Sequence, residues 1–251
     1  MNLYIKSIVF FGCSLSLLIH AKNAEYPQVS FCYDWRGKSI DLALYWLGKC
    51  HKVDRELQRA FAQAFPALIT AWQYQEQFLF DELFAVVPVG FTQPKRTAVI
   101  CLSAPYGGYG SKHFFFLFVR SFIEQELQMP WASSISREDA FVDLVFHELL
   151  HVWIDEHING KSALLLKYVD ETSEVREHIH LMAIQKMVYL RLNRLDMIEY
   201  LDNSYRNMTC TDYARAWEIV DDIEGYDVVI ADLLRYLKNK YIQRKKVREV
   251  L

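Results

Sequence analysis

Cysteine pairs with the spacing C-x-x-C are absent from the sequence, although its 251 residues include five cysteines. A cysteine-rich zinc site and a thioredoxin-type redox motif both depend on such closely spaced pairs. The sequence therefore supports neither kind of site.

A basic stripe interleaved with aromatic residues is also missing. Lysine and arginine together number 28 against 31 aspartate and glutamate, so the formal net charge is −3. Surfaces that bind nucleic acid carry clustered positive charge, and we therefore expect no nucleic-acid partner. Charged residues make up only 24% of the chain and hydrophobic residues 52%, which argues against extensive disorder and allows a sizeable core.

Internal repeats, low-complexity tracts and Pro- or Ser-rich linkers are absent as well. We therefore expect residues 25–251 to form a single domain. Two apolar segments, residues 97–102 and 113–119, predict buried strands, and the Gly-rich residues 104–110 between them predict a loop that is at best part of a substrate cleft. Apolar residues at helical spacing dominate elsewhere, which predicts an α+β fold that is mainly helical with a small sheet.

Residues 1–24 have the features of a secretory signal peptide. Lys6 gives a short positive start, residues 8–19 form an apolar run, and Ala24 offers a small residue for cleavage. The run is short for a transmembrane helix. We therefore expect a secreted or periplasmic protein without stable membrane association after cleavage. The alternatives are an uncleaved N-terminal anchor and lipidation of Cys13.

Four cysteines follow this segment, namely Cys32, Cys50, Cys101 and Cys210. In an exported chain they permit up to two disulfides. Cys32 with Cys50 is the favoured pair because both flank the first helical segment that the sequence predicts. Free buried thiols are the alternative.

An H-E-x-x-H motif, formed by His147, Glu148 and His151, lies in an apolar-periodic segment over residues 140–158. On a helix the two histidines are one turn apart and point the same way. Two neutral imidazoles at that spacing can share one Zn²⁺, and the glutamate beside them can take a proton from a water molecule.

The neighbourhood of the motif predicts a capped and buried helix. Ser136, with Asp139 three residues later, predicts the N-terminus of the helix. A broad apolar face predicts its burial; this face is formed by Phe141, Leu144, Val145, Leu149 and Val152. Burial of two histidines and a glutamate is costly unless a partner satisfies them. A metal ion would do so, and the alternative is that the histidines only form hydrogen bonds with neighbouring groups.

This motif resembles the active helix of the zincin metallopeptidases, and the resemblance covers residues 136–190. It implies a zincin-like domain with a small sheet beside the H-E-x-x-H helix. It also implies a strand along the substrate cleft, for which residues 97–102 and 113–119 are the candidates. The residues that follow His151 do not complete the metzincin pattern H-E-x-x-H-x-x-G-x-x-H, because Ile154 stands in place of its glycine.

In the gluzincin type of this family, the third zinc ligand is a glutamate on a following helix, which the sequence predicts over residues 162–192. Glu171 comes after His151 and nineteen intervening residues, the spacing of the thermolysin-like members, so the resemblance implies that Glu171 is the third ligand. Glu174 is the alternative ligand, and both acids could instead form only a solvated helix start. Val175 stands where the thermolysin-like members have an aspartate.

His178 lies seven residues after Glu171, on the same predicted helix face. It could stabilise an oxyanion, orient a ligand or serve as a satisfied core histidine.

The resemblance as a whole implies a zinc metallopeptidase, with Zn²⁺ as cofactor and a peptide or protein as substrate. His147, His151 and Glu171 would hold the zinc, and Glu148 would act as the general base. One alternative is a non-catalytic exported protein with a structural zinc site. The other is an exported helical interaction module without metal.

Overall fold

The computed structural model describes residues 26–33, 52–103, 107–110, 114–123, 135–158, 162–208 and 210–250. The predicted signal peptide and Cys50 lie outside the described residues, so the predicted cleavage and the Cys32–Cys50 pair remain predictions. None of the helices in the described part of the chain combines the length and the hydrophobicity that a membrane span requires.

Four strands of the described chain form one mixed sheet in the order β1-β2-β4-β3. The strands are β1 (Gln28–Cys32), β2 (Lys95–Cys101), β3 (Gly107–Gly110) and β4 (Phe114–Phe118). β1 and β4 both pair in parallel with β2, whereas β3 lies antiparallel to β4 at the edge of the sheet. The two strands predicted from their apolar runs are therefore confirmed as β2 and β4.

Part of the segment predicted as a loop is a strand. Gly107–Gly110 forms β3, in which Gly108 is opposite Leu117 of β4. Glycine has low strand propensity, and the loop prediction relied on that local preference. Pairing with β4 overrides the preference, because β4 offers this segment the backbone hydrogen bonds of an otherwise unpaired edge.

Helices make up most of the described chain, which confirms the mainly helical α+β class. Their bounds are α3 (Arg55–Val86), α4 (Arg120–Ile123), α5 (Arg137–His157), α6 (Ala163–Lys167), α7 (Ser173–Arg191), α8 (Leu195–Asn207), α9 (Thr211–Glu218), the π-helix η1 (Ile219–Ile223) and α10 (Tyr226–Val250).

One helix was expected over residues 162–192, but the chain forms α6 and α7 with a break between them. Tyr168 ends α6, and the side chain of Thr172 caps α7 by accepting a hydrogen bond from the Val175 N–H. A threonine at this position competes with the helical backbone and favours a new start. The break leaves Glu171 outside both helices.

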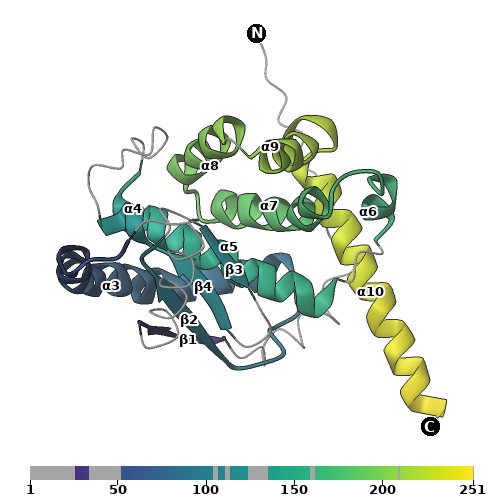
Figure 1. Ribbon diagram of the computed structural model, residues 1–251. Coiled ribbons are helices and arrows are strands. Elements are labelled where there is room, and N and C mark those ends of the chain that lie inside the picture. Colours follow the sequence, from purple (N-terminus) through teal and green to yellow (C-terminus); the bar gives the residue numbers. More distant parts are fainter. Residues whose placement is uncertain are drawn as a thin grey trace.

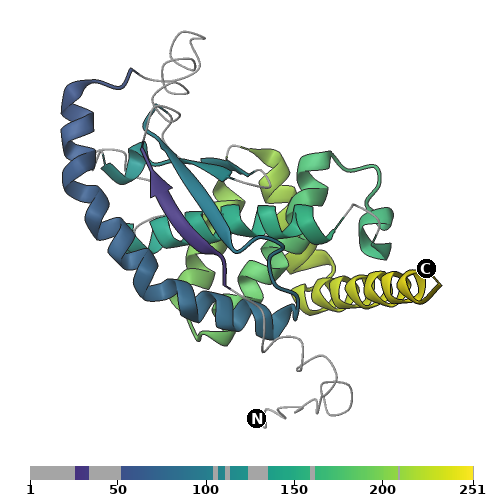
Figure 2. The ribbon, with the colours of Figure 1, turned by 90° about the horizontal axis from the view of Figure 1, so that it is seen from below.

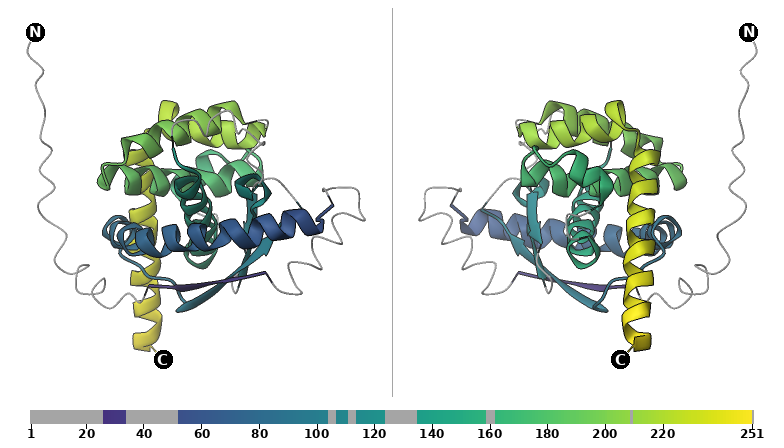
Figure 3. Two further views of the ribbon diagram at one scale, coloured as in Figure 1. Left: turned by 90° about the vertical axis from the view of Figure 1, so that its left-hand side faces the viewer. Right: turned by 90° about the vertical axis from the view of Figure 1, so that its right-hand side faces the viewer.

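Helix α5 lies in the middle of the molecule. The sheet and α3 pack against one side of it, and α7 packs against the other, with α8 and α9 further out (Figures 1 and 3). Seen from below, α3 runs as a long curved helix past the sheet (Figure 2). The rings of Phe65 and Trp72 on α3 pack against that of Phe31 on β1. α10 extends beyond the other elements at the C-terminal end (Figure 1).

This layering explains why α5 is buried over almost its whole length. Its side chains fill both interfaces, and large apolar groups that it contributes are fully buried, among them Phe141, Phe146 and Trp153. The polar groups that α5 buries have little access to bulk water and must be satisfied by the protein or by something bound to it.

Candidate metal centre

The H-E-x-x-H motif occupies the middle of α5. The side chain of Ser136 accepts a hydrogen bond from the Asp139 N–H at 3.0 Å, which confirms the predicted cap, and the helix runs to His157 without a break. His147 is 7% exposed and Glu148 is 4% exposed, while His151 is half-buried. The motif therefore lies on the side of α5 that faces the core.

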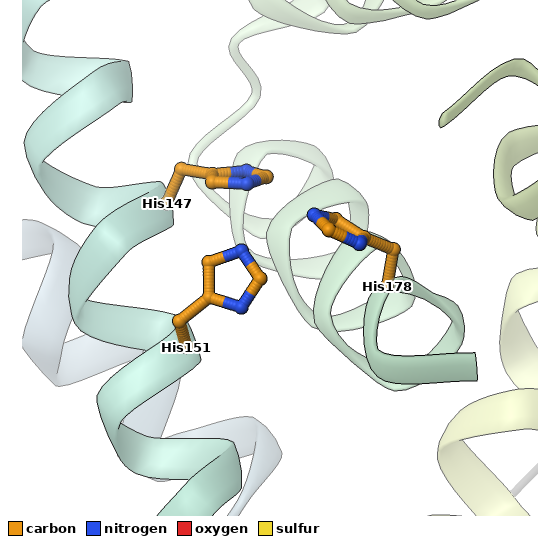
Figure 4. A group of neighbouring side chains, drawn as sticks. All are labelled: His147, His151 and His178. Atoms are coloured by element: carbon orange, nitrogen blue, oxygen red, sulfur yellow. The ribbon is translucent and has the colours of Figure 1, made fainter. Parts of the chain in front are cut away.

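Three histidines meet beside this motif. His147 and His151 come from α5 and His178 comes from α7, and their side chains point toward one another (Figure 4). The ring centroids of His178 lie 4.6 Å from His151 and 5.5 Å from His147. One potential ligand atom from each residue lies within 4.8 Å of the other two, so this group could hold a metal ion.

Hydrogen bonds fix the ring of His178 in one tautomer. Its Nδ1 lies 2.8 Å from the backbone oxygen of Glu174. A carbonyl can only accept, so Nδ1 carries the proton and Nε2 keeps its lone pair. That Nε2 is buried without a hydrogen-bond partner among the described residues. A buried imidazole with one satisfied and one vacant nitrogen has the arrangement of a metal ligand.

His147 shows the same arrangement on the other side of the group. Its Nδ1 lies 3.3 Å from Oε1 of Gln185 and 3.1 Å from the Tyr205 hydroxyl. Nε2 of His147 is therefore left for a different partner.

The three imidazoles are neutral at physiological pH. Burial lowers the pKa of His147 to about 3 and holds the pKa of His151 well below its ordinary value. Burial also lowers the pKa of His178. The mutual repulsion of charged rings adds to the effect in His147 and His151. Neutral imidazole is the form that binds a metal ion, so no proton has to be removed first.

Glu148 lies between α5 and the edge strand. Its Oε2 is buried without a hydrogen-bond partner among the described residues. Burial, with a smaller contribution from the negative charge of Glu174, raises the pKa of Glu148 to about 8. An unsatisfied carboxyl of this kind is costly, and a cation or a water molecule in the histidine group would relieve that cost.

The structure does not bring Glu171 to the histidines. Its carboxylate accepts a hydrogen bond from Nε of Arg215 at 2.9 Å, and it lies 2.8 Å from another nitrogen of the same guanidinium. The reason is the break before α7, which leaves Glu171 ahead of the Thr172 cap and outside the helix that carries His178. The geometry therefore favours His178 over Glu171 as the third ligand.

Glu174, the alternative ligand, also stays out of the group. It is half-exposed, and its carboxylate Oε1 lies 3.8 Å from Nδ1 of His178, the nitrogen that faces away from the other histidines. Its backbone oxygen instead holds that ring. A signal for His178 was present in the sequence, because a histidine in an apolar stretch of a helix needs a partner just as His147 does.

Sequence reasoning missed Tyr213 on α9. Its ring centroid lies 4.2 Å from that of His178 and 6.3 Å from that of His147. Burial raises the pKa of its hydroxyl, and the negative charges of Glu148 and Glu174 raise it further. The phenol therefore stays protonated and can act as a hydrogen-bond donor beside the histidines.

Searches against models of protein families, against curated proteins and against solved structures each found no match.

Proposed function

We propose that this chain is a zinc-dependent metallopeptidase, in which His147, His151 and His178 hold the metal and Glu148 is the general base. The observation that carries the proposal is the buried group of three neutral histidines next to a buried carboxyl whose Oε2 has no partner among the described residues. Three imidazoles suit Zn²⁺, and three protein ligands leave one position of a tetrahedral site open.

The chemistry divides between the metal and the chain. When bound, a zinc ion supplies the Lewis acid that polarises a scissile carbonyl and makes a nearby water molecule more acidic. Glu148 takes a proton from the water and later delivers it to the leaving amine.

The sheet supports the resemblance to zincins. Its antiparallel edge strand β3 packs against α5 at Glu148. We assign this strand, rather than β2 or β4, to the role of the strand along the substrate cleft. An extended peptide could add to its outer edge, which pairs with no other strand among the described residues, through backbone hydrogen bonds. The substrate class that follows is a peptide or protein segment in extended conformation.

The site of action in this proposal is outside the cytoplasm, after removal of residues 1–24. β1 begins at Gln28, so a chain cleaved near residue 24 would retain all four described strands.

A structural zinc site is the second candidate function. A metal held by His147 and His178 would link α5 to α7 in the core, where it would stabilise the packing of the two helices. Structural sites have four protein ligands, however, and they need no carboxyl beside an open position.

Two measurements on the purified mature chain separate these functions. Metal analysis should find about one zinc per chain. The wild type should cleave peptides from a broad library, whereas Glu148→Gln should keep its zinc and cleave about 10²–10⁴-fold more slowly. Leu149→Met is a matched control at the next position of α5 and should cleave at close to the wild-type rate. A wild type that binds zinc, cleaves nothing and unfolds on chelation would establish the structural function instead.

A further inference from the structure

A chain of buried polar side chains extends from His147 away from the other two histidines. The Tyr205 hydroxyl lies 2.9 Å from Oε1 of Gln185, and Nε2 of Gln185 lies 2.6 Å from Oδ1 of Asp143. The Tyr189 hydroxyl reaches the same Oδ1 at 2.9 Å. Gln185 is fully buried and Asp143 is 3% exposed, so both side chains are shielded from bulk water.

The direction of these hydrogen bonds follows from Asp143. Burial raises the pKa of Asp143 to about 6, and the hydrogen bonds from Tyr189 and Gln185 oppose that rise. The carboxyl is therefore ionised above that pH and can only accept. Gln185 must then present its NH₂ group to Asp143, which leaves its carbonyl oxygen facing Tyr205 and His147.

The orientation of this amide decides where His147 carries its proton. Oε1 of Gln185 accepts the hydrogen bond of the Tyr205 hydroxyl, and the Tyr205 oxygen in turn can accept from His147. Every group that faces Nδ1 of His147 is therefore an acceptor, and Nδ1 is protonated. If the amide were reversed, its NH₂ group would face Nδ1 and the proton would move to Nε2.

We propose that Asp143 and Gln185 are positioning residues that hold His147 in the tautomer with Nδ1 protonated, so that its Nε2 is free for the metal. The link to metal binding rests on the function proposed above. Asp143 lies one helical turn before His147 on the same face of α5, which is why one helix can supply both the ligand and the charge that sets its tautomer. Neither positioning residue is one of the three proposed metal ligands.

A purely structural role for Asp143 would predict different behaviour. An ionised carboxylate that accepts hydrogen bonds from the neutral groups of Gln185 and Tyr189 costs more in a core than an apolar side chain of similar size. A structural role would depend equally on both donors to its Oδ1. In a positioning role, the hydrogen bond from Gln185 sets the tautomer of His147, and the hydrogen bond from Tyr189 does not affect it.

The test compares three variants of the metal-free chain by imidazole ¹⁵N NMR. Asp143→Asn has nearly the same shape, but its amide can donate or accept, so Gln185 is no longer held in one orientation. We expect a signal from His147 with Nε2 protonated, and a zinc affinity about 10–100-fold below that of the wild type. Tyr189→Phe is the matched control, because it removes the other donor to Oδ1. It should keep the wild-type tautomer and its affinity.

Gln185→Met is a second variant that needs no charged group in the core. Without Oε1 to accept its proton, the Tyr205 hydroxyl can turn toward His147, so the Nε2-protonated form should again be populated. The proposal is overturned if both Asp143→Asn and Gln185→Met keep Nδ1 protonated. It is also overturned if Tyr189→Phe shifts the tautomer as far as Asp143→Asn. A wild type that binds no zinc would refute the proposed function, while the tautomers would still decide this inference.

Discussion

Gly108 on β3 lies so close to Glu148 on α5 that a Cβ atom on residue 108 would stand 2.2 Å from Cδ of Glu148. No side chain other than hydrogen fits there without displacing the carboxyl, which is the flexible group of the pair. The backbone of the edge strand therefore limits where the carboxyl of the proposed general base can lie.

This contact predicts the effect of Gly108→Ala. The added methyl group should push the carboxyl out of position, while the three histidines remain in place. We expect zinc content to be unchanged and kcat to fall by about 10²-fold, since a general base works only within hydrogen-bond reach of its proton. Peptide hydrolysis and metal analysis on the same sample measure both.

On a Glu148→Gln background the same change should have little further effect, because the two substitutions remove one function. A large additional loss would show that Gly108 acts through another group.

The choice between His178 and Glu171 gives the second prediction. His178→Ala removes one of the three imidazoles and should lower the zinc affinity by at least the roughly 10–100-fold seen when a supporting residue is lost. Glu171→Gln should leave the affinity at the wild-type level. It should cost less than about 1 kcal/mol of stability, because the ion pair with Arg215 is partly exposed to solvent, which screens it. Competition with a zinc chelator of known affinity measures both variants. Loss of zinc in Glu171→Gln, with retention in His178→Ala, would restore the ligand that the resemblance implies.

Local sequence was sufficient for α5, where the cap at Ser136 and the apolar face predict the observed helix. It was also sufficient for β2 and β4, whose apolar runs are long enough to identify a buried strand. It failed for β3, because a glycine-rich segment becomes a strand only when β4 offers it an edge. It failed at Thr172 because a short break in a helical pattern depends on one side chain and on how α6 and α7 each pack against α10.

The prediction of Glu171 as the third ligand failed for a related reason. The spacing that favoured Glu171 assumes a particular path between two helices, and that path depends on tertiary structure. The polar chain behind His147 was equally out of reach. Asp143, Gln185 and Tyr205 come from three helices, and nothing in the sequence pairs them.

The buried Glu148 carboxyl gives the third prediction, which concerns the metal-free chain. Its pKa is raised from 4.5 to about 8 in the folded state. Folding therefore favours the neutral form, so this contribution to stability is fully present below pH 4.5 and is lost as the pH rises through about 8. The side chain of Glu148→Gln cannot ionise. The free energy of unfolding of this variant, relative to that of the wild type, should therefore grow between pH 5 and pH 8.5 by on the order of 2–4 kcal/mol.

Urea unfolding with a chelator present, at both pH values, measures this advantage. The lowered pKa values of the three histidines act in the opposite direction, since their contribution is lost as the pH falls, but they are common to both proteins and cancel in the difference. An advantage that is the same at pH 5 and pH 8.5 would show that Glu148 titrates normally in the folded state.

Tyr213 gives the last prediction. Its phenol remains protonated in the site and packs against His178, so it is a candidate donor for the negative charge that develops on a carbonyl oxygen during hydrolysis. Tyr213→Phe keeps the ring and its packing but removes this donor. We expect kcat to fall by about 10²-fold with KM nearly unchanged, because the hydrogen bond would form only in the transition state. Zinc content should stay at the wild-type level.

Tyr205→Phe provides the contrast, since Tyr205 contacts His147 through Nδ1 and belongs to the polar chain behind it. That variant should lower zinc affinity, with any loss of rate recovered at saturating zinc. Equal rates for Tyr213→Phe and the wild type would leave the oxyanion to be stabilised by the metal alone.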